Sequence, residues 1–181
     1  MDVAAIISEL QTRLPGVPVE AATSVDFPTV YVPADRLVDV CLALRDTPSF
    51  GFGVLLEITA ADYLPRDPRF EVVYHLLSIA NRARLRLKVR VAAEGSVPTV
   101  QSVWLAAGWP ERELWDMFGI MIDGHADLRR LLMPDDWEGH PARKDYPVQI
   151  QKAVQTYAPL EVTEAEFRAN LERDRATRGK A

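Results

Sequence analysis

The stretch "RARLRLKVRV", residues 82–91, alternates charged and apolar side chains without a break. Successive side chains of a β-strand point to opposite faces, so this alternation predicts a strand with one apolar face and one polar face. The polar face carries the cations Arg82, Arg84, Arg86, Lys88 and Arg90. We therefore expect a half-buried strand, with its apolar face against the core and its polar face towards solvent or a partner.

Strand and helix signals flank this stretch on both sides. Short β-prone segments bounded by proline, glycine or aspartate predict further strands, and apolar residues at helical spacing predict amphipathic helices. The expected strands cover residues 17–23, 28–33, 54–63 and 69–79, and the expected helices cover residues 2–14 and 34–46. Cys41 falls on the apolar face of the second helix, which makes it a core residue. These signals predict an α+β domain over residues 1–147, with a mixed β-sheet and helices mainly on one face.

The segment "PTVQSVWLAAGWPERELWDMFGI", residues 98–120, has the pattern of two short helices. Gly108 would break the first helix, and Pro110 would lie in the first turn of the second. Glu111 and Glu113 would then lie in the first turn, where carboxylates interact favourably with the helix dipole. Because residues two apart on a helix point to different sides, the two do not form a catalytic acid–base pair. Arg112 and Asp116, four residues apart, are expected to form an ion pair.

Composition limits the classes of function. The 181 residues are 48% hydrophobic, which is enough for one buried core, and the net charge is −5. An acidic chain has no general affinity for nucleic acid or anionic bilayers, although the cationic stripe leaves a stand-alone basic-face binding module as an alternative. No apolar run approaches the ~18 residues that cross a bilayer. The N-terminus has no basic run before an apolar core, so we expect no signal peptide.

Candidate catalytic and metal-binding residues gather after residue 124. They are His125, Asp127, Asp135, Asp136, Glu138 and His140. A metal-dependent hydrolase would need three or four of them to converge, but no ligand spacing such as HExxH is present. Nucleophile elbows and phosphate-binding glycine loops are also absent from the sequence. We therefore expect no catalytic residue, no cofactor site and no metal site in this chain.

The run "ERELWDMFGIMIDGHADLRRLLMPDDWEGHPARKDYP", residues 111–147, resembles the signature of the 30-kDa subunit family of respiratory complex I, the proton-pumping NADH:quinone oxidoreductase. The segment "YVPADRLVDVCLALRDTPSFGFGVLLEITAADYLPR", residues 31–66, is also similar to that family. The resemblance covers most of residues 30–150. The chain has Trp115 where the family typically has tyrosine, and Ala126 where it has proline.

The resemblance implies a non-catalytic structural and assembly subunit. Such a subunit holds no flavin, iron–sulfur cluster or quinone, and it lies in the peripheral arm against the 49-kDa partner beside the quinone site. The assembled complex would use FMN, iron–sulfur clusters, NADH and a quinone. Its expected location is the cytoplasmic side of the bacterial inner membrane, or the matrix side of the mitochondrial inner membrane, with membrane contact only through partners. Related subunits also serve membrane-bound hydrogenases, which leaves the electron donor open.

The end of the signature, "DDWEGHPARKDYP", residues 135–147, is interpreted as a docking surface. Trp137 would provide an apolar anchor, and Arg143, Lys144 and Asp145 would provide charge pairs. Gly139 permits a bend that a bulkier residue tolerates less readily. The expected partner-binding residues are Glu111, Arg112, Glu113, Asp116, His125, Arg129, Arg130, Trp137, Glu138, His140, Arg143, Lys144, Asp145 and Tyr146.

Residues 148–181 are expected to form a partner-binding C-terminal arm. Residues 148–162 show no sustained helical or alternating pattern. Thr163 and Glu166 have the spacing of a capping box, which predicts the start of a short helix with Phe167 and Leu171 on one face. Because this segment is highly charged, we expect it to extend from the core and to become ordered along a partner.

Overall fold

The computed structural model describes residues 2–147 and 163–178. The chain divides into two compact units, Met1–Pro147 and Val148–Ala181, and each is considered by itself. The first unit has the α+β fold that the sequence predicts.

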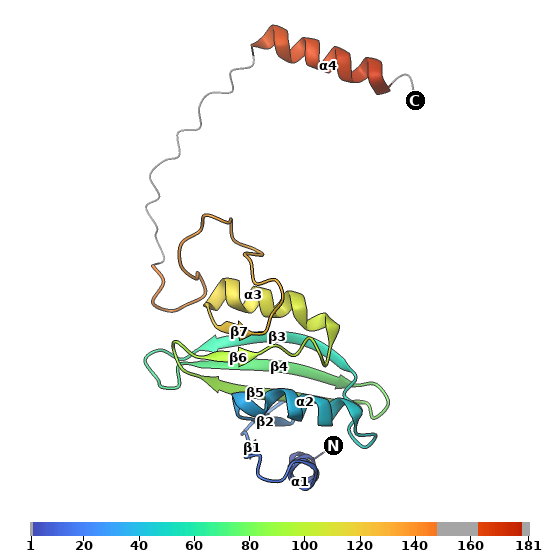
Figure 1. Cartoon of the computed structure of the whole chain (residues 1–181), viewed down its shortest axis with the longest axis vertical. Coiled ribbons are helices and arrows are strands. Elements are labelled where there is room, and N and C mark those ends of the chain that lie inside the picture. Colours follow the sequence, from blue (N-terminus) through green and yellow to red (C-terminus); the bar gives the residue numbers. More distant parts are fainter. Residues whose placement is uncertain (1, 148–162, 179–181) are drawn as a thin grey trace. The chain divides into compact units, whose positions relative to one another are not determined.

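The domain is built on a five-stranded mixed sheet (Figure 1). In spatial order the strands are β1 (Glu20–Ala21), β2 (Thr29–Tyr31), β5 (Ala83–Val91), β4 (Phe70–Ser78) and β3 (Val54–Asp62). β2 pairs with β5 in parallel, and the other neighbours are antiparallel. The alternating stretch forms a strand, as its pattern predicts, and the structure places that strand at the centre of the sheet. Each of the other expected strands is also present.

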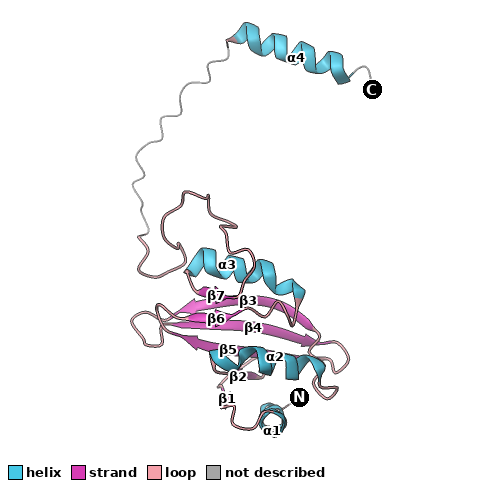
Figure 2. Ribbon diagram, viewed as in Figure 1, coloured by secondary structure: helices cyan, strands magenta, loops and turns pink. Residues whose placement is uncertain are grey.

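One face of the sheet forms the core. The inward residues of β5 are Leu85, Leu87, Val89 and Val91, and all are buried. They share one apolar cluster with the buried side chains of α1 (Val3–Arg13), α2 (Leu37–Asp46) and α3 (Gly108–Phe118). Cys41 is fully buried in that cluster, and burial raises the pKa of its thiol. The expectation that helices lie mainly on one face is confirmed, and Figure 2 shows α2 and α3 beside the strands of the domain.

The predicted helix after Pro98 is wrong. Residues 98–107 contain the end of β6 (Ser96–Pro98), a single turn and a short 3₁₀ helix (Leu105–Ala107), and Gly108 begins α3 instead of ending a helix. One turn is enough to bury Val100, Val103 and Trp104, and the backbone at Trp104 is then extended at φ −132° and ψ 114°. The spacing of these three apolar residues therefore reflects a single turn packed against the core, and not a helix. The predicted second helix, with Pro110 in its first turn, is confirmed as α3.

α3 lies between two short strands and beside the edge of the main sheet. β6 and β7 (Met121–Asp123) pair in parallel and lie on either side of it in the sequence. The helix packs against β3, the outer strand, as Figure 1 shows. This arrangement places the C-terminal end of α3 and the loop at residues 124–147 next to one corner of the sheet.

The cationic face of β5 is largely neutralised by this chain. Three cations of the predicted stripe face carboxylates, as Arg86 with Asp26 (2.7 Å), Lys88 with Glu71 (3.0 Å) and Arg90 with Glu20 (3.1 Å). Arg82 lies outside β5, in the preceding turn, at φ +49°. Aromatic rings, which the sequence of β5 lacks, come from the neighbouring segment: Phe27 and Tyr31 each lie under cations of the stripe. The paired carboxylates weigh against a nucleic-acid-binding module.

The second unit contains α4 (Glu164–Arg178). The predicted capping box is confirmed, because the N–H of Thr163 donates to the Glu166 carboxylate at 2.9 Å and the N–H of Glu166 donates to the Thr163 hydroxyl at 3.3 Å. Phe167 is 59% exposed and Leu171 is 42% exposed. The expectations for residues 148–162 lie outside the described residues, and the binding of a partner by this segment stays a prediction. No helix in the described part of the chain is long and apolar enough to cross a membrane.

Candidate docking site

Asp116 in α3 holds the loop at residues 124–147 by accepting hydrogen bonds from it. Its carboxylate is fully buried at the end of α3. One oxygen accepts the backbone N–H groups of Leu131, Leu132 and Met133 at 2.9, 2.7 and 3.0 Å. The other oxygen accepts a guanidinium N–H of Arg130 at 2.8 Å. One carboxylate therefore folds four consecutive loop residues against the helix.

The electrostatics of Asp116 match this role. Burial alone would raise its pKa, but the N–H groups of the loop and the Arg130 guanidinium stabilise the charged form more strongly and lower the pKa to about 2. Asp116 is therefore ionised at neutral pH. A buried ionised carboxylate is stable only while these donors stay in place, so the loop conformation and the charge depend on each other.

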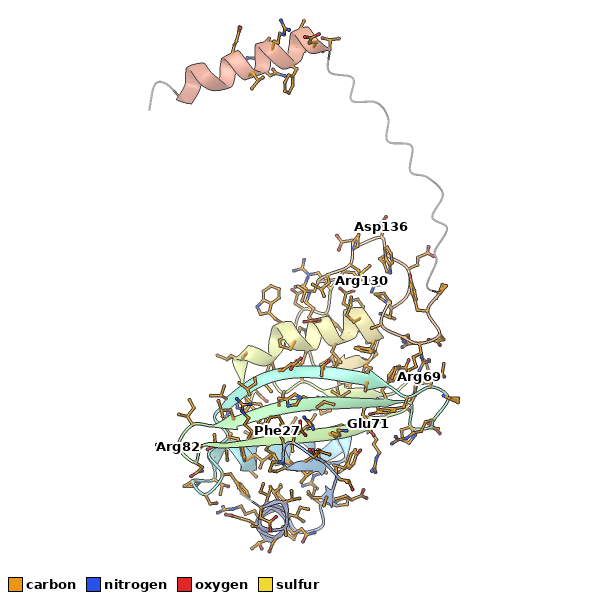
Figure 3. All side chains as sticks on the ribbon, turned by 180° about the vertical axis from the view of Figure 1, so that it is seen from behind. Phe27, Arg69, Glu71, Arg82, Arg130 and Asp136 are labelled. Carbon is orange, nitrogen blue, oxygen red and sulfur yellow. The ribbon has the colours of Figure 1, made fainter. Side chains whose placement is uncertain are left out.

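Arg130 connects the middle of the loop to α3. Its guanidinium donates to the carbonyl oxygens of Trp137 at 2.8 Å and Gly139 at 2.9 Å, in addition to Asp116. The same group lies 5.3 Å from the ring centroid of Trp115. Figure 3 shows Arg130 beside α3, below the part of the loop that carries Asp136. The guanidinium thus fills the inside of the loop, and its side chain is only 13% exposed.

The C-terminal end of α3 holds residues 140–143. Nδ1 of His140 lies 3.0 Å from the Asp116 carbonyl oxygen, and Arg143 donates to the carbonyl oxygens of Phe118 and Gly119. Burial lowers the pKa of His140, and the nearby Arg130 and Arg143 cations lower it further. Gly119 has φ +70°, and a Cβ there would collide with the His140 ring. Glycine is therefore required where the loop crosses the helix end.

A latch of three side chains ties the end of the loop to the sheet. Arg69, 7% exposed, donates to the Asp62 carboxylate at 2.6 Å and to the Asp145 carboxylate at 2.6 and 2.9 Å. Asp62 also accepts the backbone N–H of Lys144 at 2.9 Å. Neither Arg69 nor Asp62 was predicted from the sequence. The sequence indicates this pair only by an acidic residue at the end of one strand and a basic residue just before the next, on either side of residues 63–68.

Glu111 anchors the other end of α3. It is 1% exposed and accepts the Val100 N–H at 2.7 Å and the Thr99 hydroxyl at 2.6 Å. Burial raises the pKa of Glu111, and these hydrogen bonds oppose that effect. Glu113 is exposed on another side of the helix, as the spacing of the two residues predicts. Glu111 therefore holds the turn that precedes α3.

Arg112 and His125 hold the start of the loop. Arg112 donates to the carbonyl oxygens of Arg129 and Arg130 and lies 3.7 Å from the Asp127 carboxylate. The predicted ion pair between Arg112 and Asp116 is therefore wrong, because the loop provides nearer partners for both. Nδ1 of His125 accepts the Asp127 N–H, so its Nε2 donates to the Gly108 carbonyl oxygen at 3.0 Å.

The outer part of the loop is held by its aromatic residues. The rings of Trp137 and Tyr146 stack with centroids 6.5 Å apart, and the Tyr146 hydroxyl donates to the Glu138 carbonyl oxygen at 3.0 Å. Gly139 has φ +76°, and a Cβ there would lie 2.8 Å from the Tyr146 ring. A bend at Gly139 was predicted from the sequence, and the backbone has one there.

The fourteen residues expected to bind a partner differ in exposure, and Arg112, Trp137, His140, Arg143 and Tyr146 are intermediate. Glu111, Asp116, His125 and Arg130 are mostly buried, with their side chains engaged by other parts of this chain. Five others are exposed, namely Glu113, Arg129, Glu138, Lys144 and Asp145. The sequence did not predict the exposed apolar residues of this region, which include Leu105 just before α3 (93% exposed), Trp109 in α3 (65%) and Leu132 in the loop (60%). Partner binding by the fourteen residues stays a prediction.

Among the described residues, no group of three His, Cys, Asp or Glu side chains could hold a metal ion. The six candidate ligands named from the sequence, from His125 to His140, do not converge in that part of the chain. The expectation that the purified protein holds no metal stays a prediction.

Comparison with known proteins identifies the family. A family model described as "Respiratory-chain NADH dehydrogenase, 30 Kd subunit" matches residues 30–152. The chain belongs to this family. The match includes the whole of α3 and its loop, and it confirms the resemblance that the signature at residues 111–147 indicates.

Individual relatives agree with the family model. A subunit of NADH-quinone oxidoreductase from Roseiflexus sp. (strain RS-1) is 45% identical over 158 residues, which cover 87% of this chain and 91% of that protein. A subunit of the same enzyme from Geobacter sulfurreducens is 50% identical over 123 residues, covering 67% of this chain and 75% of the relative. A chain in the structure of the membrane-bound sulfane sulfur reductase, an archaeal respiratory membrane complex, superimposes with a TM-score of 0.64 at 26% identity. That match covers 80% of this chain and 85% of the other.

Proposed function

We propose that this family member is a non-catalytic structural and assembly subunit of the peripheral arm of a proton-translocating NADH:quinone oxidoreductase. In this proposal it docks on the 49-kDa partner near the quinone site. The observation that carries the proposal is the loop at 124–147, which lies within the family match and is fastened to α3 and to the sheet. A loop held by Asp116 and by Arg69 presents a preformed surface.

A preformed loop favours docking for a physical reason. Binding costs conformational entropy when it orders a mobile segment, and a loop that is already ordered avoids most of that cost. Exposed Trp109 and Leu132 offer apolar contact area, and Trp137 is half-buried on Tyr146. Exposed Arg129 and Lys144 add charges that orient a partner.

The chemistry of the complex then belongs to its other subunits. We infer that FMN, the iron–sulfur clusters, NADH and the quinone are bound elsewhere, because Asp116, Arg130 and Arg69 are already engaged in holding this fold. We place the chain on the cytoplasmic side of a bacterial inner membrane, or the matrix side of a mitochondrial one, reaching the membrane through partners.

A second candidate is the corresponding subunit of another membrane-bound respiratory complex, such as a hydrogenase. The similarity to a chain of the sulfane sulfur reductase complex favours it. The higher identity to NADH-quinone oxidoreductase subunits favours the first proposal. The subunit composition of the isolated complex separates the two, because only the first includes the subunits that bind NADH.

The test is assembly in the native host with variants of the loop. Trp137→Ala should weaken association with the partner by about 2 kcal/mol, as expected for an apolar anchor. Lys144→Glu reverses an exposed charge while keeping the backbone N–H that binds Asp62, and it should weaken association as well. Arg36→Glu, a partly exposed site on another part of the domain, serves as the control and breaks only the surface ion pair with Asp39. The fraction of chain recovered with the 49-kDa partner after gentle detergent extraction measures the effect.

Two results would contradict the proposal. Normal recovery of the complex with lost quinone reduction in Trp137→Ala would give this chain a direct part in the chemistry. Recovery of the tagged chain without any other component of a respiratory complex would remove the assembly function.

A further inference from the structure

The cationic stripe divides into a neutralised part and an unmatched part. Arg86, Lys88 and Arg90 are each paired with a carboxylate of this chain. Arg82 and Arg84 form no ion pair with any residue that the structure describes. Figure 3 shows Arg82 at one end of the sheet and Glu71 towards the other. Unmatched positive charge is therefore concentrated at the end of β5 that begins the strand.

This end of the sheet is hollowed and partly apolar. Phe27, Leu77, Arg82 and Arg84 line a shallow hollow of about 510 Å³ on the face that carries no helix. Arg84 and Phe27 also border a second hollow of about 240 Å³. A concave surface with aromatic and aliphatic walls and two arginines at its border favours a ligand that is both apolar and anionic.

The second hollow has a mixed apolar and polar lining. Its walls include Leu56, which is 49% exposed, together with Glu57 and His75. Burial lowers the pKa of His75, and the nearby Arg86 cation lowers it further, so the ring is mainly neutral at pH 7. Glu57 is the one carboxylate among these lining residues, and it opposes a densely anionic ligand.

Arg84 is held in place before any partner arrives. Its guanidinium lies 5.5 Å from the centroid of the Phe27 ring, and the guanidinium of Arg86 lies 5.4 Å from the same centroid. Stacking on an aromatic ring restricts an arginine without using its N–H donors, which can then bind a carboxylate. A restricted side chain loses less entropy on binding, so Arg84 is suited to anchor an acidic residue.

We propose that this surface, the Arg84 patch (Phe27, Leu56, Leu77, Arg82 and Arg84), docks a polypeptide segment of a neighbouring subunit in which a large apolar side chain stands beside an aspartate or glutamate. The apolar side chain fills the hollow, and the carboxylate meets the two unmatched arginines. The inference rests on the proposed function, because it assumes that neighbouring subunits surround this domain. It adds a second interface on the helix-free face, separate from the loop at 124–147.

A polypeptide fits this surface better than a nucleic acid or a bilayer. Two arginines neutralise one or two negative charges, whereas a phosphodiester chain requires a longer row of cations. The adjoining carboxylates of Glu57 and Asp26 repel such a chain and repel anionic headgroups as well. Leucine and phenylalanine walls favour burial of an apolar side chain instead.

Photo-cross-linking in the assembled complex tests the location of the partner. p-Benzoylphenylalanine is introduced at Leu56, inside the patch, and at Thr12, an exposed control position on α1. The expected result is a covalent link from position 56 to another subunit, at a peptide with an acidic residue next to a large apolar one. An intact complex without a link at position 56, or a link to lipid or nucleic acid, overturns the inference and leaves the proposed function standing. Isolation of the chain without other subunits overturns both.

Charge variants test the recognition. Arg84→Glu should reduce the amount of chain retained in the complex about tenfold, because it places like charges together, while Arg84→Lys should retain most of it. Arg36→Glu controls for charge reversal at a partly exposed site elsewhere on the domain, where the arginine forms a surface ion pair with Asp39. Reversal of the cross-linked acidic residue to arginine should restore retention of the Arg84→Glu chain. Equal retention of Arg84→Glu and Arg84→Lys overturns the inference.

Discussion

Replacement of Asp116 by asparagine should release the loop at 124–147 from α3. The side chain keeps its size, but an amide cannot accept from all four of its present donors. If the amide oxygen faces the N–H groups of residues 131–133, the amide NH₂ group faces the Arg130 guanidinium, which is also a donor. In the reverse orientation the NH₂ group faces the three backbone N–H groups. The first orientation leaves the Arg130 guanidinium without this acceptor, and the second leaves the three backbone N–H groups without theirs. In both orientations Arg130 loses the negative charge that faces it.

The magnitude follows from the pKa of Asp116. A fall from an ordinary value of 3.8 to about 2 corresponds to about 2.5 kcal/mol of folding free energy at pH 7. The pKa is lower in the folded state, so this contribution is present above pH 4 and is lost as the pH falls towards 2. At pH 3 roughly half of it should remain. The unmatched donors of the asparagine variant bring the expected cost at pH 7 to about 2–4 kcal/mol.

Urea unfolding of the purified chain measures this difference. Glu113→Gln, an exposed site on the same helix, is the control and should have almost no effect. Hydrogen exchange of the amides of Leu131, Leu132 and Met133 provides a local readout, because these three N–H groups should lose protection in the Asp116→Asn chain before the sheet does.

Two outcomes would refute the reasoning. The first is an Asp116→Asn chain as stable as Glu113→Gln at pH 7 with unchanged protection of residues 131–133. The second is a stability difference that does not shrink between pH 7 and pH 3, which would show that the charge of Asp116 is not the source.

Three further predictions concern buried or capping groups. Arg69→Met should destabilise the domain by about 3 kcal/mol or more, because it leaves the Asp62 carboxylate buried without its cation, whereas exposed Arg66→Met should cost much less in the same urea titration. Cys41 should not react with a thiol reagent in the native chain at pH 7 and should react fully in denaturant, since its thiol is buried and its pKa is raised; rapid native reaction would contradict the core assignment. Thr163→Ala should lower the helical circular dichroism of a peptide spanning α4, and an unchanged spectrum would show that the cap is not needed.

The sequence by itself determined the local structure and the family. Alternation at residues 82–91 predicted a half-buried strand, and the pair Thr163 and Glu166 predicted the start of α4. These features can be predicted from the sequence because strand faces and helix caps depend on residues only two to four positions apart. Where a local pattern allowed two structures, as at Val100, Val103 and Trp104, the sequence predicted a helix and the core selected a single turn.

Only the tertiary structure decided which charges meet. Arg69 and Asp145 are 76 positions apart, and Arg86 and Asp26 are 60 positions apart, so no local period could pair them. Sequence reasoning gave Asp116 to Arg112 on the same helix, whereas the returning loop supplies Arg130 and three backbone N–H groups. The partner of a charge is set by which side chains become neighbours when the core closes. For the same reason, only the folded sheet shows that Arg86, Lys88 and Arg90 are neutralised while Arg82 and Arg84 are left without a carboxylate among the described residues.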